Sequence, residues 1–139
     1  MYDNALSLVH CSLCDLGYAP YSAEDRRWHA TYHARVDKLA AHLGRWPAGY
    51  SERERQKADG DRLIRHGANL ADKLSGAELV LTALYDREVL QSLHRQRPRQ
   101  PPTFTSFLRN LDLAAVVGEE IALHVRQQHR LREKRRAHE

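Results

Sequence analysis

Two cysteines and two histidines near the N-terminus constrain this chain more than any other feature. Cys11 and Cys14 are separated by two residues, and they are the only cysteines among the 139 residues. His29 and His33 follow after a gap of fourteen residues and stand one helical turn apart, so a helix would place both imidazoles on one face. Two thiolates from a tight turn and two imidazoles from one helix face suit tetrahedral Zn²⁺. The spacing predicts a structural zinc ion bound by Cys11, Cys14, His29 and His33.

The histidines fall in a segment with clear helix signals. Ser22 is a suitable N-cap, and Asp25 takes the place of the acid in a capping box. Glu24 adds negative charge to the first turn, where the helix dipole favours it. Residues 26–43 contain neither glycine nor proline, and Gly44 is a natural C-terminal stop. We expect the small core of this module to come from four residues: Leu16, Tyr18, Tyr21 and Trp28.

Redox chemistry is the alternative interpretation of the cysteine pair. A disulfide between Cys11 and Cys14 would close a tiny loop and stabilise little. A thioredoxin-like site needs the second cysteine inside a helix that follows a strand. Residues 17–20 include Gly17 and Pro20 and cannot continue such a helix. Half of a zinc site is therefore the favoured interpretation.

The residues around these ligands match a known zinc finger. A bulky apolar residue stands two positions after the second cysteine and a tyrosine stands four positions after it. A Glu-Asp pair precedes the first histidine, and an aromatic residue comes directly before the second. The residues concerned are Cys11-Ser-Leu-Cys14-Asp-Leu16-Gly-Tyr18, Glu24-Asp25 and Tyr32-His33. Residues 9–36 thus resemble the finger that precedes the acetyltransferase domain of sister-chromatid cohesion acetyltransferases. The resemblance implies a ββα finger of the C2H2 type. It does not extend to an acetyl-CoA-binding domain, for which the remaining residues are too few and too helical.

The helix of this finger does not carry the residues that usually read DNA bases. In the common binding mode three helix positions contact successive bases. Here those positions hold Ser22, Asp25 and Trp28, and none is the Arg, Asn or Gln that makes good bidentate base contacts. Asp25 is better explained as a cap and Trp28 as part of the core. We expect no sequence-specific readout by this helix.

The remainder of the chain predicts a helical body, so the expected fold is mainly α with an N-terminal finger. A polar, solvated helix is expected from Ser51, which opens a capping box, to about His66, with Gly60 weakening its middle. A break at Gly67 and Asn69 and a short turn over residues 70–74 should follow. Ser75 then begins a stronger apolar helix that continues to about Arg95.

The C-terminal third begins with a proline-rich linker at residues 97–102. Thr103 is expected to cap a short helix and Asp112 to cap one last helix. Glu120 and His124 stand one turn apart on that helix, but a histidine at the core edge explains them better than a metal site. We expect three parts: a finger at 1–44, a helical body at 45–125 and a basic C-terminal helix end at 126–139.

The net positive charge of the chain comes from its C-terminal segment. The chain has 22 basic and 18 acidic residues, a net charge of +4. Residues 126–139 hold six basic and two acidic side chains and so carry all of this excess. The first function hypothesis is therefore a protein that binds nucleic-acid phosphates without recognising the bases. The basic residues proposed as contacts are Arg126, Arg130, Arg132, Lys134, Arg135 and Arg136, with a contribution considered from Arg95, Arg97 and Arg99.

The second hypothesis is a protein–protein adaptor or a homodimer with a purely structural zinc. Four protein ligands would leave no open zinc position for a substrate, so we expect no enzymatic activity. The mean hydropathy is −0.68, no long apolar run occurs, and residues 1–4 lack the basic start of a secretory signal. We expect a cytoplasmic protein with no membrane partner.

Overall fold

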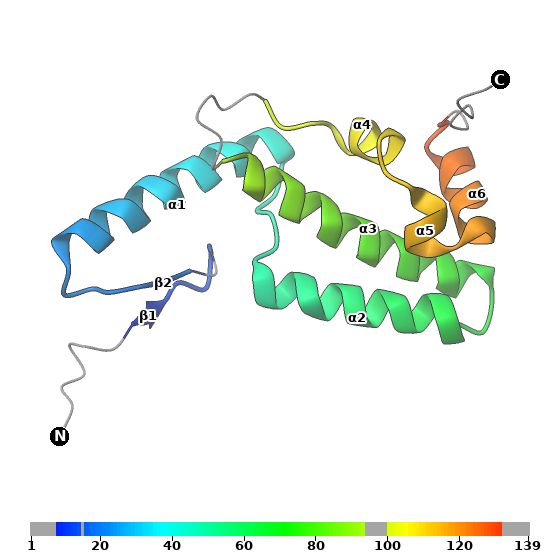
Figure 1. Cartoon of the computed structure of the whole chain (residues 1–139), viewed down its shortest axis with the longest axis horizontal. Coiled ribbons are helices and arrows are strands. Elements are labelled where there is room, and N and C mark those ends of the chain that lie inside the picture. The colour runs from blue at the N-terminus through cyan, green and yellow to red at the C-terminus, as the bar shows by residue number, and fades with distance from the viewer. Residues whose placement is uncertain (1–7, 15, 94–99, 132–139) are drawn as a thin grey trace. The chain divides into compact units, whose positions relative to one another are not determined.

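A computed structural model describes residues 8–14, 16–93 and 100–131, and its fold is mainly α-helical, as predicted. A short antiparallel hairpin precedes a series of helices (Figure 1). The elements are β1 (Val9–His10), β2 (Gly17–Tyr18), α1 (Ala23–Leu43), α2 (Tyr50–His66), α3 (Leu70–Ser92), α4 (Phe104–Arg109), α5 (Leu113–Val117) and α6 (Glu119–Gln128). None of the helices within these residues is long and apolar enough to cross a membrane.

The chain divides into two compact units. The first holds the described residues up to Arg53 together with Asp86–Pro101, and the second holds Glu54–Tyr85 and the described residues from Pro102 onward. The first unit contains the hairpin, α1 and the last turns of α3. The second contains most of α2 and α3 and all of α4, α5 and α6.

Both ends of α1 form as the sequence predicts. The Ser22 hydroxyl accepts a hydrogen bond from the backbone N–H of Asp25 at 3.2 Å. Gly44 adopts the left-handed conformation, with φ of 78°, and its N–H donates to the carbonyl of Ala40. The capping box itself does not form: the N–H of Ser22 donates to the Ala19 carbonyl, and the Asp25 carboxylate accepts from the N–H of Ala19 at 2.7 Å. Asp25 therefore anchors the segment at Ala19, just before the helix, to the first turn of α1.

The prediction of a fully solvated helix for residues 51–66 is wrong at Gly60. Helix α2 begins at Tyr50, and its outer face carries surface ion pairs such as Asp61–Arg65, as expected. Gly60, however, is buried against α3. A Cβ atom at Gly60 would lie 2.5 Å from the carbonyl oxygen of Gly76 and 2.7 Å from Cγ2 of Val80. The glycines let α2 and α3 of the second unit pack side by side at very short range (Figure 1).

The predicted start of the apolar helix at Ser75 is also wrong. Helix α3 is continuous from Leu70 to Ser92, and Ser75 lies inside it. The side-chain oxygen of Asn69 accepts from the N–H of Asp72 at 2.9 Å, so Asn69 supplies the cap. The packing of Gly76 against Gly60 holds the segment helical through Ser75 and Gly76, two residues of modest helix propensity.

The last predicted helix is divided in two at Gly118. Asp112 caps α5 as expected, by accepting from the N–H of Ala115 at 3.3 Å, and Thr103 caps α4 in the same way. Gly118 has φ of 89°, which ends α5 after five residues before α6 begins. The core of the second unit comprises Ala77, Leu81, Leu108, Leu113, Val117, Ile121, Ala122 and Val125.

Candidate metal centre

The hairpin and α1 bring three of the predicted zinc ligands together. Strands β1 and β2 pair with Val9 opposite Tyr18, and the N–H of Cys11 donates to the carbonyl of Leu16 at 2.9 Å. This turn holds Cys11 and Cys14 near the first turns of α1, which carry His29. Among the described residues, the potential ligand atoms of Cys11, Cys14 and His29 all lie within 4.8 Å of one another.

This donor set fits a zinc ion. The Cys14 Sγ and the His29 Nε2 are 3.3 Å apart. Zn–S bonds of about 2.3 Å and Zn–N bonds of about 2.0–2.1 Å at tetrahedral angles require an S···N separation of about 3.6 Å. The two atoms therefore need little movement to share one ion. Cys14 is buried, whereas Cys11 and His29 are half-buried, so the centre lies at the edge of the protein rather than in its core.

The surroundings act on the two thiols in opposite directions. A hydrogen bond from the backbone N–H of Cys14 is the main factor that lowers the pKa of the Cys11 thiol. Burial is the main factor that raises the pKa of the Cys14 thiol, and its interaction with Cys11 raises it further. Metal binding requires both groups as thiolates, so it would be linked to the release of protons.

Aromatic packing holds the His29 ring in place. The rings of Tyr18 and His29 stack with centroids 4.1 Å apart and planes only 5° from parallel. Tyr18 lies on β2, so this contact joins the hairpin to α1 beside the ligand atoms. The stack supports the orientation that directs Nε2 toward Cys14.

His33 occupies the next turn of α1 beside this cluster. Its ring meets that of His29 edge-on, with centroids 5.6 Å apart, and lies 5.1 Å from the ring of Trp46. The three-residue cluster described above does not include it. Its assignment as the fourth ligand stays a prediction, which its place one turn from His29 supports.

A buried carboxylate anchors the loop that carries Trp46. Asp86 is fully buried in the first unit, and its two oxygens accept from both terminal nitrogens of Arg45, at 2.6 and 2.9 Å. The N–H of Ala48 donates to the same carboxylate at 2.8 Å. Trp46 lies between these two anchored residues, so the loop holds its ring against His33. Trp46 is not among the site residues that the sequence predicts, although its place two residues after the Gly44 stop puts it in the loop that follows α1.

Two residues expected in the small core are instead exposed. Tyr21 is 52% exposed and Trp28 is 49% exposed, so both core assignments are wrong. Trp28 stacks on Tyr32, one turn further along α1, with centroids 5.8 Å apart. Within the described part of the chain, no apolar layer covers this face of α1, whereas Ala19 and Cys14 are buried beside the ligands.

The other predicted site residues lie in the second unit or outside the described residues. Arg126 is half-buried in the last turn of α6, and Arg130 is exposed beyond the end of that helix. Arg130 therefore does not belong to a helix continuing past Gln128. Glu120 is exposed and His124 is half-buried on α6, and neither belongs to a metal cluster of the described residues. Outside the described ranges lie Arg95, Arg97, Arg99, Arg132, Lys134, Arg135 and Arg136.

Comparison with known families agrees with this geometry. Residues 3–35 match the family described as the zinc-finger of the acetyltransferase ESCO. The segment is a zinc finger. The match contains all four predicted ligands and ends inside α1, so it covers none of the helices that follow. Comparisons with curated proteins and with solved structures give no match.

Proposed function

We propose that this chain is a non-catalytic interaction protein whose zinc finger binds a protein partner through exposed apolar side chains. The observation that carries the proposal is the distribution of these side chains. Of the eight large hydrophobic residues that are exposed in the described part of the chain, five lie in the finger. They are Leu8, Val9, Leu13, Tyr21 and Trp28. Protein-binding sites are typically apolar patches, and Trp and Tyr are enriched among the residues that dominate their binding energy.

The charge of the finger also favours a protein over a nucleic acid. Residues 8–36 contain three basic side chains (Arg26, Arg27, Arg35) and three acidic ones (Asp15, Glu24, Asp25). One of the basic groups is engaged locally, since the Arg26 guanidinium donates to the carbonyl of Pro20. A neutral module lacks the cationic surface that binding to phosphates requires.

The zinc ion has a structural role in this proposal. Cys11, Cys14, His29 and, as predicted, His33 would hold it, and it would supply the stability that so small a module cannot obtain from a hydrophobic core. These four ligands would then fix the orientation of the hairpin on α1 and so present the exposed side chains to the partner.

Paired variants test this proposal. Proteins that cross-link to the zinc-loaded chain are identified by mass spectrometry, and each candidate is then titrated by calorimetry. Leu13→Ser with Trp28→Ser should weaken binding by at least about 2 kcal/mol, because both exposed side chains lie in the interface. Tyr50→Ser is the matched control, since Tyr50 is 64% exposed on α2 outside the finger. Equal losses in the two variants at unchanged zinc content would contradict the proposal.

Nucleic-acid binding through the C-terminal segment is the second candidate. Its support is the net charge of +4 carried by residues 126–139, of which Arg126 and Arg130 lie on the described surface. A gel-shift series with the full chain and with a chain ending at residue 125 tests it over a range of salt concentrations. Affinity that falls steeply with salt and disappears with the truncation would favour phosphate contacts.

A further inference from the structure

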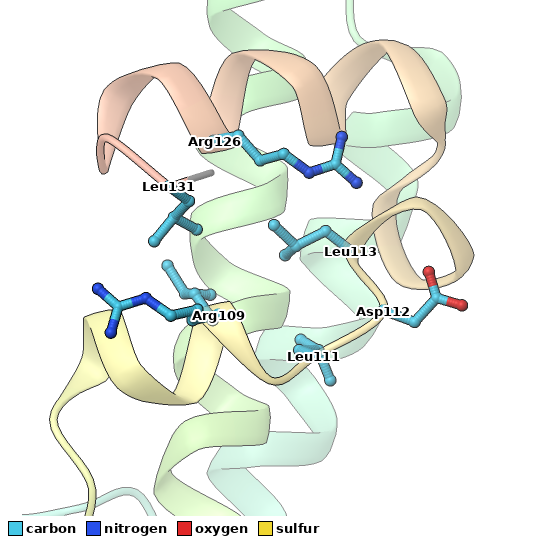
Figure 2. A pocket seen from close by; sticks show the side chains of 7 residues that line it. Arg109, Leu111, Asp112, Leu113, Arg126 and Leu131 are labelled. Carbon is cyan, nitrogen blue, oxygen red and sulfur yellow. The ribbon is translucent and has the colours of Figure 1, made fainter. Parts of the chain in front are cut away.

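A depression in the second unit lies between α4, α5 and the C-terminal end of α6 (Figure 2). Its volume is about 90 Å³. Four leucines supply its apolar lining: Leu108, Leu111, Leu113 and Leu131. Leu108 and Leu113 belong to the buried core, whereas Leu111 and Leu131 are half-buried at its edge. None of these residues belongs to the finger, so the depression is independent of the surface proposed above.

Two arginines complete the lining. Arg109 comes from the last turn of α4 and Arg126 from the last turn of α6. Neither guanidinium forms an ion pair or a hydrogen bond with another described residue. The one acidic residue of the lining, Asp112, accepts from the N–H of Ala115, and Figure 2 shows its carboxylate directed away from the other lining side chains. The apolar surface is therefore bordered by positive charge that no described carboxylate balances.

The helix dipole explains only part of this arrangement. A cation in the last turn of a helix is favoured by the partial negative charge there, and this accounts for either arginine by itself. It does not explain why two arginines from different helices line the same apolar depression. The solvated surface of each helix offers other positions where a cation could lie.

The volume limits what the site can accept. Small-molecule pockets usually measure about 300–1,000 Å³, and a cavity of about 150 Å³ is needed to take up benzene. A depression of about 90 Å³ suits one aliphatic side chain. We propose that it binds an acidic peptide segment of a partner protein, which inserts one leucine-like side chain among the four leucines. Carboxylates on either side of that residue would pair with Arg109 and Arg126, because arginine and carboxylate form charge-assisted hydrogen bonds.

The probe for this site is a fluorescein-labelled peptide with one leucine between two pairs of glutamates. Fluorescence polarisation should show saturable binding to the full zinc-loaded chain. Arg109→Glu combined with Arg126→Gln should weaken binding about tenfold, as the loss of two such pairs predicts. The matched control is Arg87→Glu, an exposed arginine of α3 outside the lining, which should leave the affinity unchanged.

Two further measurements separate the site from general attraction to basic residues. Leu131→Lys adds positive charge but removes part of the apolar lining, so it should weaken binding to the pocket although it would strengthen a purely electrostatic complex. Amide shifts in nuclear magnetic resonance spectra of the wild type should concentrate in residues 108–113 and 126–131. Thermal melts followed by circular dichroism identify any variant that fails to fold.

Three results would overturn the proposal. These are equal affinity for a peptide with serine in place of leucine, stronger binding by Leu131→Lys, and an equal loss in Arg87→Glu. Absence of saturable binding to the wild type would also exclude this site. The finger variant Leu13→Ser with Trp28→Ser should bind the peptide normally, so failure here and failure of the finger proposal are distinguishable.

Discussion

Asp86→Ala should lower the free energy of unfolding by about 2–4 kcal/mol, because it removes the buried acceptor that anchors the loop after α1. The carboxylate accepts two hydrogen bonds from Arg45 and one from the N–H of Ala48, at 2.6–2.9 Å. Hydrogen bonds to charged groups contribute about 1.5–3 kcal/mol each. We discount the two from Arg45, because its side chain is 44% exposed and regains water when the partner is lost. The backbone N–H of Ala48 gains no hydrogen bond to water in return if its surroundings stay closed to solvent.

Urea denaturation of the zinc-loaded protein, followed by circular dichroism, measures this difference. The matched control is Asp59→Ala, which removes the same group from an ion pair with Arg62 at 2.9 Å on the exposed surface of α2. That control should change stability by no more than about 0.5 kcal/mol. The thermal midpoint of Asp86→Ala should fall by about 5–12 °C. The fluorescence of Trp46 should change as well, because its ring then loses its fixed position against His33. If the two aspartate variants were equally stable, the argument that Asp86 anchors the loop would be refuted.

Three further changes test other parts of the structure. Cys14→Ala should release the metal, shown by elemental analysis, and lower the thermal midpoint, whereas full stability of the metal-free protein in calorimetry would exclude a structural zinc. Gly60→Ala should destabilise the protein by about 1–3 kcal/mol in urea denaturation, because its Cβ would overlap the Gly76 carbonyl. A gain in stability of about 0.5–1 kcal/mol, the usual effect of this substitution in an open helix, would contradict the close packing. Tyr85→Phe should cost about 1 kcal/mol in the same assay because the buried hydroxyl donates to the carbonyl of Pro102 at 2.7 Å, and an unchanged midpoint would mean that this bond contributes nothing.

Features encoded by neighbouring residues could be predicted from the sequence. The cap at Ser22, the left-handed stop at Gly44 and the caps at Thr103 and Asp112 all form as expected. Each depends on two groups at most four residues apart: a side chain and a backbone N–H at the three caps, and two backbone groups at Gly44. The two cysteines are local in the same sense, since one turn carries both, whereas His29 reaches them from α1, fifteen residues after Cys14.

Features that depend on distant residues could not be predicted in this way. Gly60 appears in the sequence as a weak point in a polar helix, and its packing partner Gly76 lies in the next helix. Asp86 begins the charged triplet Asp86-Arg87-Glu88 of α3, and its partner Arg45 is 41 residues earlier. Trp28 is exposed because none of the described elements covers it, and no pattern within residues 22–33 predicts this. In each case the deciding contact, or its absence, belongs to the tertiary structure.

The division of burial along the finger predicts that a bound metal would matter most at its N-terminal end. Each hairpin strand has only two residues, Val9 is 43% exposed, and hairpins of this size are marginal in water without further packing. Among the described residues of the 8–21 segment, which exclude residue 15, the buried side chains are Cys14 and Ala19. The C-terminal half of α1 differs, because Val36, Leu39 and Ala40 are buried there and Gly44 closes the helix. We therefore expect packing to sustain that half without a metal, and the hairpin to depend on the ligands. Loss of zinc should thus act first on the segment that carries Leu8, Val9 and Leu13, and so couple metal binding to the apolar surface proposed for the partner.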